Sequence, residues 1–160
     1  RTVALVPFAG PGADPVSWRA LRDALGAELP RLGLQPAGHA AVDAFLSRRR
    51  ATDPPLLGRS DLRGLRDAVG ADLVMAGVLH RCRQQPPFAV SLTGWLIDTA
   101  SGEIVAAGMV SLEGDALRGP FGPGGDVTFE RTVAEAARRL RLLLGQEPAP
   151  RPPTATRPTI

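Results

Sequence analysis

Residues 71–112 read ADLVMAGVLHRCRQQPPFAVSLTGWLIDTASGEIVAAGMVSL, and this stretch decides the fold. It contains three segments, Ala71–Cys82, Phe88–Ile97 and Glu103–Leu112, that are rich in apolar residues and largely alternate. Period-two patterning between turn residues is typical of half-buried antiparallel strands. Asp98–Gly102 has turn chemistry, because aspartate accepts hydrogen bonds from amides ahead of it and glycine takes a positive φ. The stretch therefore predicts a three-stranded meander whose apolar face must be covered.

The alternation also assigns side chains to faces. In the second strand, one face is expected to carry Phe88, Val90, Leu92, Gly94 and Leu96. In the third strand, the corresponding face is expected to carry Ile104, Ala106, Gly108, Val110 and Leu112. Side chains two positions apart in a strand share a face, so these residues are predicted to lie together under the covering helices.

The segments before this stretch predict a strand and a long helix. Thr2–Phe8 is an apolar run that reads as a buried strand. Asp14 followed by Pro15 starts a helix, because the carboxylate caps free amides and proline suits the first helical position. Pro30 is expected to end or kink that helix, and Gly33 to follow its last turn. The apolar stripe of the helix consists of Trp18, Leu21, Leu25, Leu29 and Leu32.

Shorter elements complete the chain. We expect a short strand at Leu34–Ala37, a helix at Ala40–Arg49, and a helix that Ser60 caps and Gly70 closes. After the meander, Asp126 is expected to cap a final helix that ends at Gly145. The buried stripe of this helix is predicted to be Phe129, Val133, Ala137, Leu140 and Leu144.

The expected order is β-α-β-α-α-β-β-β-α. It predicts an α/β fold, with a mixed sheet that contains an antiparallel three-strand meander and has helices packed against it. Residues 1–145 are expected to form a single domain. Residues 146–160, QEPAPRPPTATRPTI, are proline-rich without apolar periodicity and predict an extended tail or linker.

Composition limits the classes of function. The 160 residues are 44% hydrophobic and 22% charged, as in ordinary soluble domains. Lysine, asparagine and tyrosine are absent, which a GC-rich genome explains. The sequence pI of 10.8 comes from scattered arginines, while the net charge is only +3. Nucleic-acid binding is therefore a minor alternative. The single cysteine, Cys82, forms no internal disulfide and leaves the compartment open.

The sequence offers two weak candidates for ligand chemistry. Gly10–Asp14 lies between a strand and a helix, where nucleotide folds hold phosphate, and it supplies the alternative of a small-ligand or nucleotide site. Pro15 stands where the dinucleotide fingerprint has its third glycine, and the lysine of the P-loop is missing. His80 and Cys82 alternate along a strand and are expected on one face, but a zinc site needs further ligands.

Other chemistry finds little support. The carboxylates Asp72, Asp98, Asp115 and Asp126 each read as a cap, a turn former or a solvated end. A serine-nucleophile elbow is missing. We therefore expect no enzyme, no catalytic residues, no cofactor and no metal ligands.

Three residues are candidates for protein contacts. Trp18 lies early in the first helix, and tryptophan is enriched at interfaces. Trp18 and the strand residue Trp95 both fall on periodic positions where core packing competes with binding. Arg118 and Phe121 lie in the Gly/Pro-rich loop Leu117–Asp126, which is longer than a simple connection requires.

Several motifs resemble those of the TolB amino-terminal-like group and its CsgG and LpoB-type relatives in bacterial envelopes. The opening strand Val3-Ala-Leu-Val-Pro-Phe8 matches V-A-V-L-P-F, and Leu65–Val78 is close to A-x-x-L-G-A-D-x-V-x-x-G-x-V. Leu96–Glu103 matches L-I-D-x-x-T-G-E, except that Ser101 replaces the threonine. The resemblance spans roughly residues 2–112. The chain has no room for the membrane-spanning hairpins of the pore-forming CsgG branch.

The resemblance implies a non-enzymatic protein-binding or assembly module of a bacterial cell envelope. Its expected location is the periplasm or the outer membrane. The lipid-bearing cysteine of the lipoprotein branch would precede Arg1, so the resemblance leaves open whether this chain has one. The implied partners are other envelope proteins or further copies of this chain. Neither nucleic acid nor a membrane contact beyond that anchor is expected.

Overall fold

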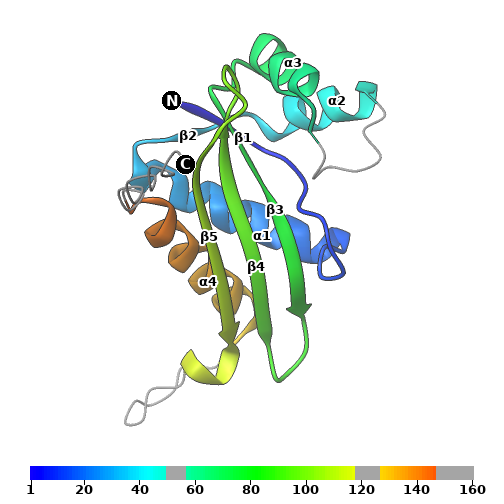
Figure 1. Cartoon of the computed structure of the whole chain (residues 1–160). Coiled ribbons are helices and arrows are strands. Elements are labelled where there is room, and N and C mark those ends of the chain that lie inside the picture. Colours follow the sequence, from blue (N-terminus) through cyan, green and yellow to red (C-terminus); the bar gives the residue numbers. More distant parts are fainter. Residues whose placement is uncertain (50–56, 118–126, 147–160) are drawn as a thin grey trace, which may run out of the picture.

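The elements follow the predicted order (Figure 1). The computed structural model describes residues 1–49, 57–117 and 127–146. The strands and helices are β1 (Thr2–Leu5), α1 (Pro15–Glu28), β2 (Gln35–Pro36), α2 (His39–Arg49), α3 (Arg59–Val69), β3 (Leu73–Arg83), β4 (Ala89–Asp98), β5 (Ile104–Glu113) and α4 (Phe129–Leu144). The predicted α/β class with a mixed sheet is confirmed.

The sheet has the strand order β2-β1-β3-β4-β5. β1 pairs in parallel with β2 and β3, whereas β3, β4 and β5 form the predicted antiparallel meander. β1 ends at Leu5, earlier than expected, before Pro7, which has no amide hydrogen to donate. The chain nevertheless continues beside β3, where the Ala9 amide donates to the Gly77 carbonyl at 3.0 Å.

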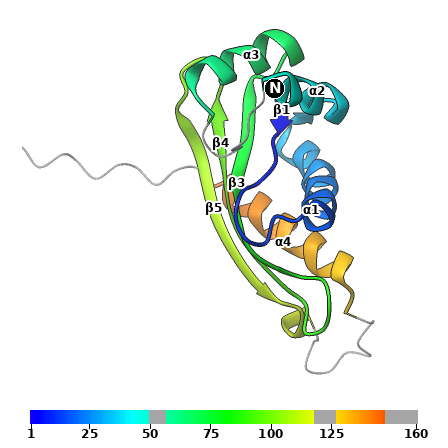
Figure 2. The ribbon, with the colours of Figure 1, turned by 90° about the vertical axis from the view of Figure 1, so that its right-hand side faces the viewer.

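Helices lie on both faces of the sheet, but they cover them unequally. α1 and α4 lie side by side along one face, which we call the inner face (Figure 2). α2 and α3 lie at the end of the molecule where the chain begins, and they pack on the opposite, outer face (Figure 1). The meander strands extend well beyond α2 and α3.

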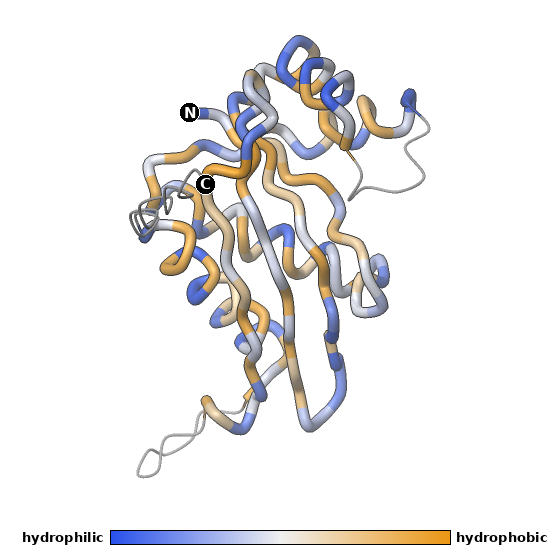
Figure 3. The backbone as a smooth tube through the Cα atoms, in the orientation of Figure 1, coloured by the Kyte–Doolittle hydropathy of each residue, from blue (hydrophilic) through white to orange (hydrophobic). Residues whose placement is uncertain are grey.

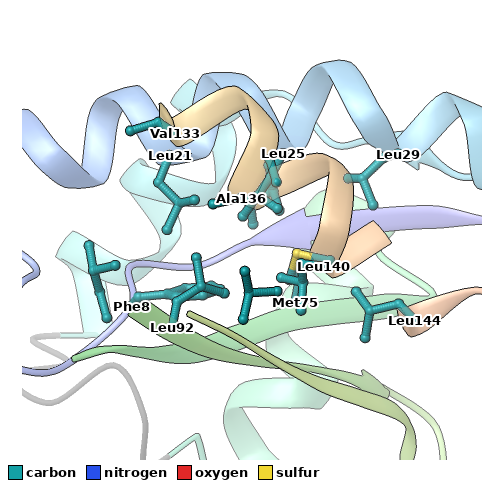
Figure 4. Packing of buried hydrophobic residues seen from close by; sticks show 14 of the residues in the cluster. Phe8, Leu21, Leu25, Leu29, Met75, Leu92, Val133, Ala136, Leu140 and Leu144 are labelled. Carbon is teal, nitrogen blue, oxygen red and sulfur yellow. The ribbon is translucent and has the colours of Figure 1, made fainter. Parts of the chain in front are cut away.

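The larger core fills the space between the inner face and helices α1 and α4 (Figure 4). Leu21 and Leu25 of α1 meet Leu140 of α4 and Met75 of β3, all of them almost fully buried. The predicted inner-face residues of β4 are confirmed, since Val90, Leu92 and Leu96 belong to this cluster. The expected α4 stripe is also confirmed: Val133, Ala137, Leu140 and Leu144 are buried and Phe129 packs against the cluster.

A row of three glycines crosses the inner face. Gly77 of β3 pairs with Gly94 of β4, which pairs with Gly108 of β5. The ring of Phe8 occupies the space above Gly77, where a Cβ atom would lie 2.5 Å from it. Leu140 fits in the same way over Gly94, where its Cδ2 would lie 2.8 Å from an added Cβ. The row is therefore a shallow channel that lets Phe8 and α4 approach the sheet closely.

The outer face has a smaller core at one end only. Val74 and Ala76 of β3 and Val42 and Phe45 of α2 belong to this cluster, and Trp95 packs against it. The next row along the strands consists of Val78, Thr93 and Met109, which pair in register and belong to neither cluster. Hydrophilic residues prevail beyond this row, at the end of β3 and in its connection to β4 (Figure 3).

Several predicted boundaries are confirmed. Asp14 caps α1 by accepting hydrogen bonds from the Val16 and Ser17 amides, with Pro15 in the first turn. A 3₁₀ turn, Leu29–Leu32, follows α1, and Gly33 ends it with φ of 70°. In the β4–β5 turn, Asp98 accepts from the Ala100 and Ser101 amides, and Gly102 has φ of 76°.

Two predicted helix starts need correction or fall outside the described residues. α3 is capped at Gly58 rather than Ser60, because the Asp61 carboxylate accepts from the Gly58 amide at 3.0 Å. α4 is capped by the Thr128 hydroxyl, which accepts from the Arg131 amide. Asp126, the expected cap, lies outside the described residues. The domain boundary at 145 stays a prediction, as does the tail.

Two irregularities in pairing overturn predicted faces. The register of β4 against β5 shifts near Val105, so Ile104 pairs with Ile97 on the outer face instead of joining Ala106 on the inner face. A second shift between Leu79 and Arg81 separates His80 from Cys82. An extra residue in one strand moves every later side chain of that strand to the opposite face of the sheet. The hydrophobic pattern of the strand alone does not show where such a residue lies.

Candidate interaction surface

β5 has one unpaired edge in the described part of the chain, because it hydrogen bonds to β4 alone. Its regular stretch Ala106–Leu112 contains neither charge nor proline. Natural edge strands are usually protected from strand pairing by charges, prolines or bulges. In β5 the irregularity near Val105 and the charge of Glu113 stand only at the ends, and Glu103 precedes the strand, so the middle of the strand is open to a further strand.

Large apolar side chains are exposed along this edge. Met109 is 69% exposed and Ile104 is 62% exposed, both on β5, and Leu142 of α4 is 43% exposed. In the described ranges, the remaining large hydrophobic side chains with comparable exposure are Val105, also on β5, and Val16 on α1. Clustered apolar exposure indicates an interaction surface, whereas a single exposed residue such as Val16 is ordinary.

A groove runs between the edge of β5 and the neighbouring face of α4. Its volume is about 380 Å³, and it is lined by Met109, Val110, Ser111, Arg139, Leu142, Leu143 and Gln146. We use the name β5 edge surface for Ile104, the regular stretch Ala106–Leu112 and Leu142 together. This surface offers unpaired backbone groups on a strand and an apolar wall on a helix. Addition of an extended strand uses these two features.

An ion-pair cluster on α4 borders the groove. Glu135 accepts from Arg138 at 2.7 Å and from Arg139 at 2.9 Å. Glu135 and Arg139 are one helical turn apart, a spacing at which opposite charges on a helix surface form pairs. The hydrogen bonds from Arg138 lower the pKa of Glu135 to about 2, with a further contribution from Arg139 and against the effect of burial. Arg139 therefore enters the groove with its charge largely compensated.

Replacing Glu135 with glutamine is expected to lower the free energy of unfolding at pH 7 by about 1 kcal/mol. The value is small because Arg138 and Arg139 are each more than a third exposed and water screens the pairs. The folded-state pKa lies below the ordinary 4.5, so the stabilisation is complete above that pH and is lost as the pH falls toward 2.

Urea unfolding of both proteins from pH 7 to pH 3 measures this effect, and the difference between the two stabilities is expected to shrink below pH 4.5. Glu103→Gln is the control, since the Glu103 carboxylate has no ion pair among the described residues. It should change the free energy of unfolding by less than about 0.5 kcal/mol. A constant difference between Glu135→Gln and wild type at all pH values would contradict the assignment.

Two amides of the Gly10–Asp14 loop are already hydrogen bonded within the protein. The Gly12 amide donates to the Leu79 carbonyl at 2.9 Å, and the Ala13 amide donates to the Gly10 carbonyl at 3.1 Å. The first amides of α1 are bound by the Asp14 carboxylate, whose pKa is lowered mainly by the hydroxyl and amide of Ser17. An anion at this helix terminus would meet a negative charge instead of unpaired donors. The loop is thus a strand-to-helix turn that binds its own side chain.

The other chemical candidates are dispersed. His80 is exposed on the outer face and bonds Thr93 at 2.9 Å, whereas Cys82 is half-buried toward the inner face, where burial raises the pKa of its thiol. The prediction that they share a face is wrong. Asp72 accepts from the Thr2 amide, and Asp98 forms its turn and pairs with Arg1. Within the ranges that the structure describes, no three His, Cys, Asp or Glu residues are grouped as metal ligands.

The predicted contact residues lie elsewhere or outside the described ranges. Trp18 is half-buried, and its ring stacks on Phe8 with centroids 5.3 Å apart. It contributes to the core and does not line the groove. Arg118 and Phe121 fall outside the described residues, so their role in contacts stays a prediction. The described helices include none that is long and apolar enough to cross a membrane.

The sequence did not lead us to name Met109, Ile104 and Leu142 as contact residues. The available signal was a strand whose polar-face positions, Ala107 and Met109, are not polar and whose interior has no charge. Recognising that signal as functional also requires knowing that β5 is an edge strand. The order of strands in a sheet depends on tertiary contacts and is not contained in the periodicity of one segment.

No protein-family model matches the chain, and no curated protein matches it. Solved structures do resemble it. The lipoprotein GNA1162 from Neisseria meningitidis has a TM-score of 0.58 at 18% identity, over 70% of this chain and 79% of that one. PelC from Paraburkholderia phytofirmans, a dodecamer, has a TM-score of 0.52 at 16% identity, over 90% and 87%. The LpoB C-terminal domain from Salmonella enterica has a TM-score of 0.49 at 19% identity, over 69% and 81%.

At these identities the likeness to GNA1162 and PelC shows a common fold. The fold implied by the resemblance to envelope lipoproteins is thereby supported. The CsgG part of the resemblance stays a prediction.

Proposed function

We propose that this chain is a non-enzymatic protein-binding module of a bacterial cell envelope and that it binds through the β5 edge surface. The observation that carries the proposal is the coincidence of an uncharged, unpaired strand edge with the exposed side chains of Ile104, Met109 and Leu142. In the described part of the chain this is the place where main-chain hydrogen-bonding capacity and apolar surface occur together.

The similar solved structures support the proposal that the chain acts in a bacterial cell envelope. GNA1162 is a lipoprotein and PelC assembles as a dodecamer, and both have this fold. A lipid anchor upstream of Arg1, in the periplasm or at the outer membrane, is the corresponding proposal for this chain. Fractionation of source cells with an antibody to the chain tests the location, and recovery in the cytosol would contradict it.

Site-specific photo-crosslinking in cells of the source organism tests the binding surface. A photoreactive amino acid at Met109 is expected to give protein adducts of defined mass. Val16 is the matched control, because it is also a large apolar residue with 60% exposure but lies on α1. Equal adducts at the two positions, or none at Met109, would contradict the proposal. Mass spectrometry of the adduct identifies the partner.

A further inference from the structure

The shape and charge of β5 restrict what can pair with it. The register against β4 is regular from Ala106 to Glu113, and the irregularity near Val105 ends the regular edge on the other side. Because Ala106–Leu112 is uncharged, a charged strand placed beside it would lose hydration without gaining an ion pair. An uncharged extended segment with its own free backbone edge is therefore the occupant that this edge fits best.

β5 of a second copy meets these requirements. The other edge strand of the sheet, β2, has only two residues, one of them Pro36, so it does not offer an equivalent edge within the described ranges. Two identical strands can pair antiparallel about a two-fold axis, and such a contact is self-complementary by symmetry. A second copy therefore supplies the uncharged strand that β5 lacks.

The charges at the strand ends disfavour one of the registers open to such a pairing. If Ala106 pairs with Leu112 of the second copy, the two-fold axis passes through the midpoint, Met109. Glu113 then opposes Val105 of the second copy, and it is already paired with Arg81 at 3.0 Å. A shift of the axis to Gly108 would instead oppose Glu103 and Glu113, and like charges in directly opposite positions are destabilising.

Side-chain size favours the register with Met109 on the axis. Met109 projects from the outer face, where it pairs with Thr93, and its neighbours on that face are Ala107 and Ser111. Across the axis, Met109 would meet Met109 of the second copy, and the small side chains of Ala107 and Ser111 leave room on either side. The pairing thus covers the most exposed large apolar side chain of the described residues.

We propose that two copies associate through antiparallel pairing of their β5 strands, with Met109 on the two-fold axis, to form one continuous sheet. The inference rests on the proposed function, because it assigns an occupant to the same β5 edge surface. The groove beside Leu142 would then receive the strand of the second copy.

Disulfide crosslinking of the full chain tests the pairing and its register. In a Cys82→Ser background, Met109→Cys alone is expected to form a disulfide-linked dimer under mild oxidation. Ala107→Cys alone and Ser111→Cys alone should give little dimer, but their equimolar mixture should crosslink, because these positions face each other across the axis. Ser47→Cys, at an exposed position on α2, measures crosslinking by random collision.

A charge swap gives a second measurement that does not depend on cysteines. Sedimentation of the unmodified chain should show a dimer. Met109→Glu and Met109→Arg should each weaken it by about tenfold or more, and their mixture should restore it. Circular dichroism checks that each variant is folded.

The outcomes separate this inference from the proposed function. A chain that stays monomeric at its highest soluble concentration, or a dimer that crosslinks at Ser47→Cys and not at Met109→Cys, would overturn the pairing. If Met109 then captures a different protein in cells, the proposed function holds and only the second copy is rejected. If the dimer forms as described, in-cell adducts at Met109 should have the mass of two copies.

Discussion

Replacing Gly77 with alanine is expected to lower the free energy of unfolding by about 3 kcal/mol or more. The added Cβ would lie 2.3 Å from the carbonyl oxygen of Thr93 and 2.5 Å from the ring of Phe8. The carbonyl belongs to the neighbouring strand and cannot move without breaking the pairing of β3 with β4. The ring is held by its stacking on Trp18. The alanine therefore has to displace either the sheet or the core.

Chemical unfolding followed by circular dichroism measures the loss. Gly26→Ala is the matched control: Gly26 lies inside α1, and a Cβ there would lie 3.9 Å from Leu5, an ordinary contact distance. Alanine favours helix over glycine, so this control is expected to raise the stability by about 0.5–1 kcal/mol. Similar stability changes in the two variants would show that the close approach at Gly77 is not the cause.

Replacing Leu140 with alanine is expected to lower the free energy of unfolding by about 2–5 kcal/mol. Leu140 is fully buried between α4 and the inner face, where it packs beside Met75 and Leu25 (Figure 4). Removal of its isobutyl group leaves a cavity in the layer that joins α4 to the sheet. Val16→Ala is the control, since this apolar side chain on α1 is 60% exposed, lies outside the β5 edge surface and should change the stability by less than about 0.5 kcal/mol.

Because Leu140 packs directly over Gly94, substitutions at the two positions are expected to affect each other. Gly94→Ala alone is expected to destabilise by about 1–3 kcal/mol, because its Cβ would lie 2.8 Å from Cδ2 of Leu140. In the Leu140→Ala background the obstructing atom is gone and the new methyl group enters the space left behind. The double variant should therefore be more stable than the sum of the single effects predicts by about 1 kcal/mol or more. Strict additivity would contradict the fit of Leu140 over Gly94.

Most of the fold could be predicted because local chemistry and tertiary structure agree. The turn at Asp98–Gly102 and the cap at Asp14 use side-chain hydrogen bonds within three residues, so their signals are complete in short segments. The alternation of β4 is likewise local, and its inner-face residues are buried as expected. Each of these features depends on a few adjacent residues.

The predictions that were wrong concern features that depend on residues far apart in the sequence. The bulged pairings near Val105 and after Leu79 are determined by the partner strand, so the alternation of one strand misplaces Ile104 and His80. The position of Trp18 in the helical stripe correctly suggested packing, but its stacking on Phe8 depends on a contact between β1's continuation and α1. The candidate site could not be predicted, because the edge position of β5 becomes known only with the whole sheet.

The position of β1 between β2 and β3 has a consequence for how the chain acquires its structure. The Thr2 amide donates to Asp72, which lies 70 positions later in the chain. During synthesis on the ribosome, β1 emerges long before the strand that it will join, whereas β3, β4 and β5 follow one another and close short loops. Long loops close slowly because of their entropy, so the hydrogen bonds between β1 and β3 are expected to form after those of the meander, although β1 is synthesised before it.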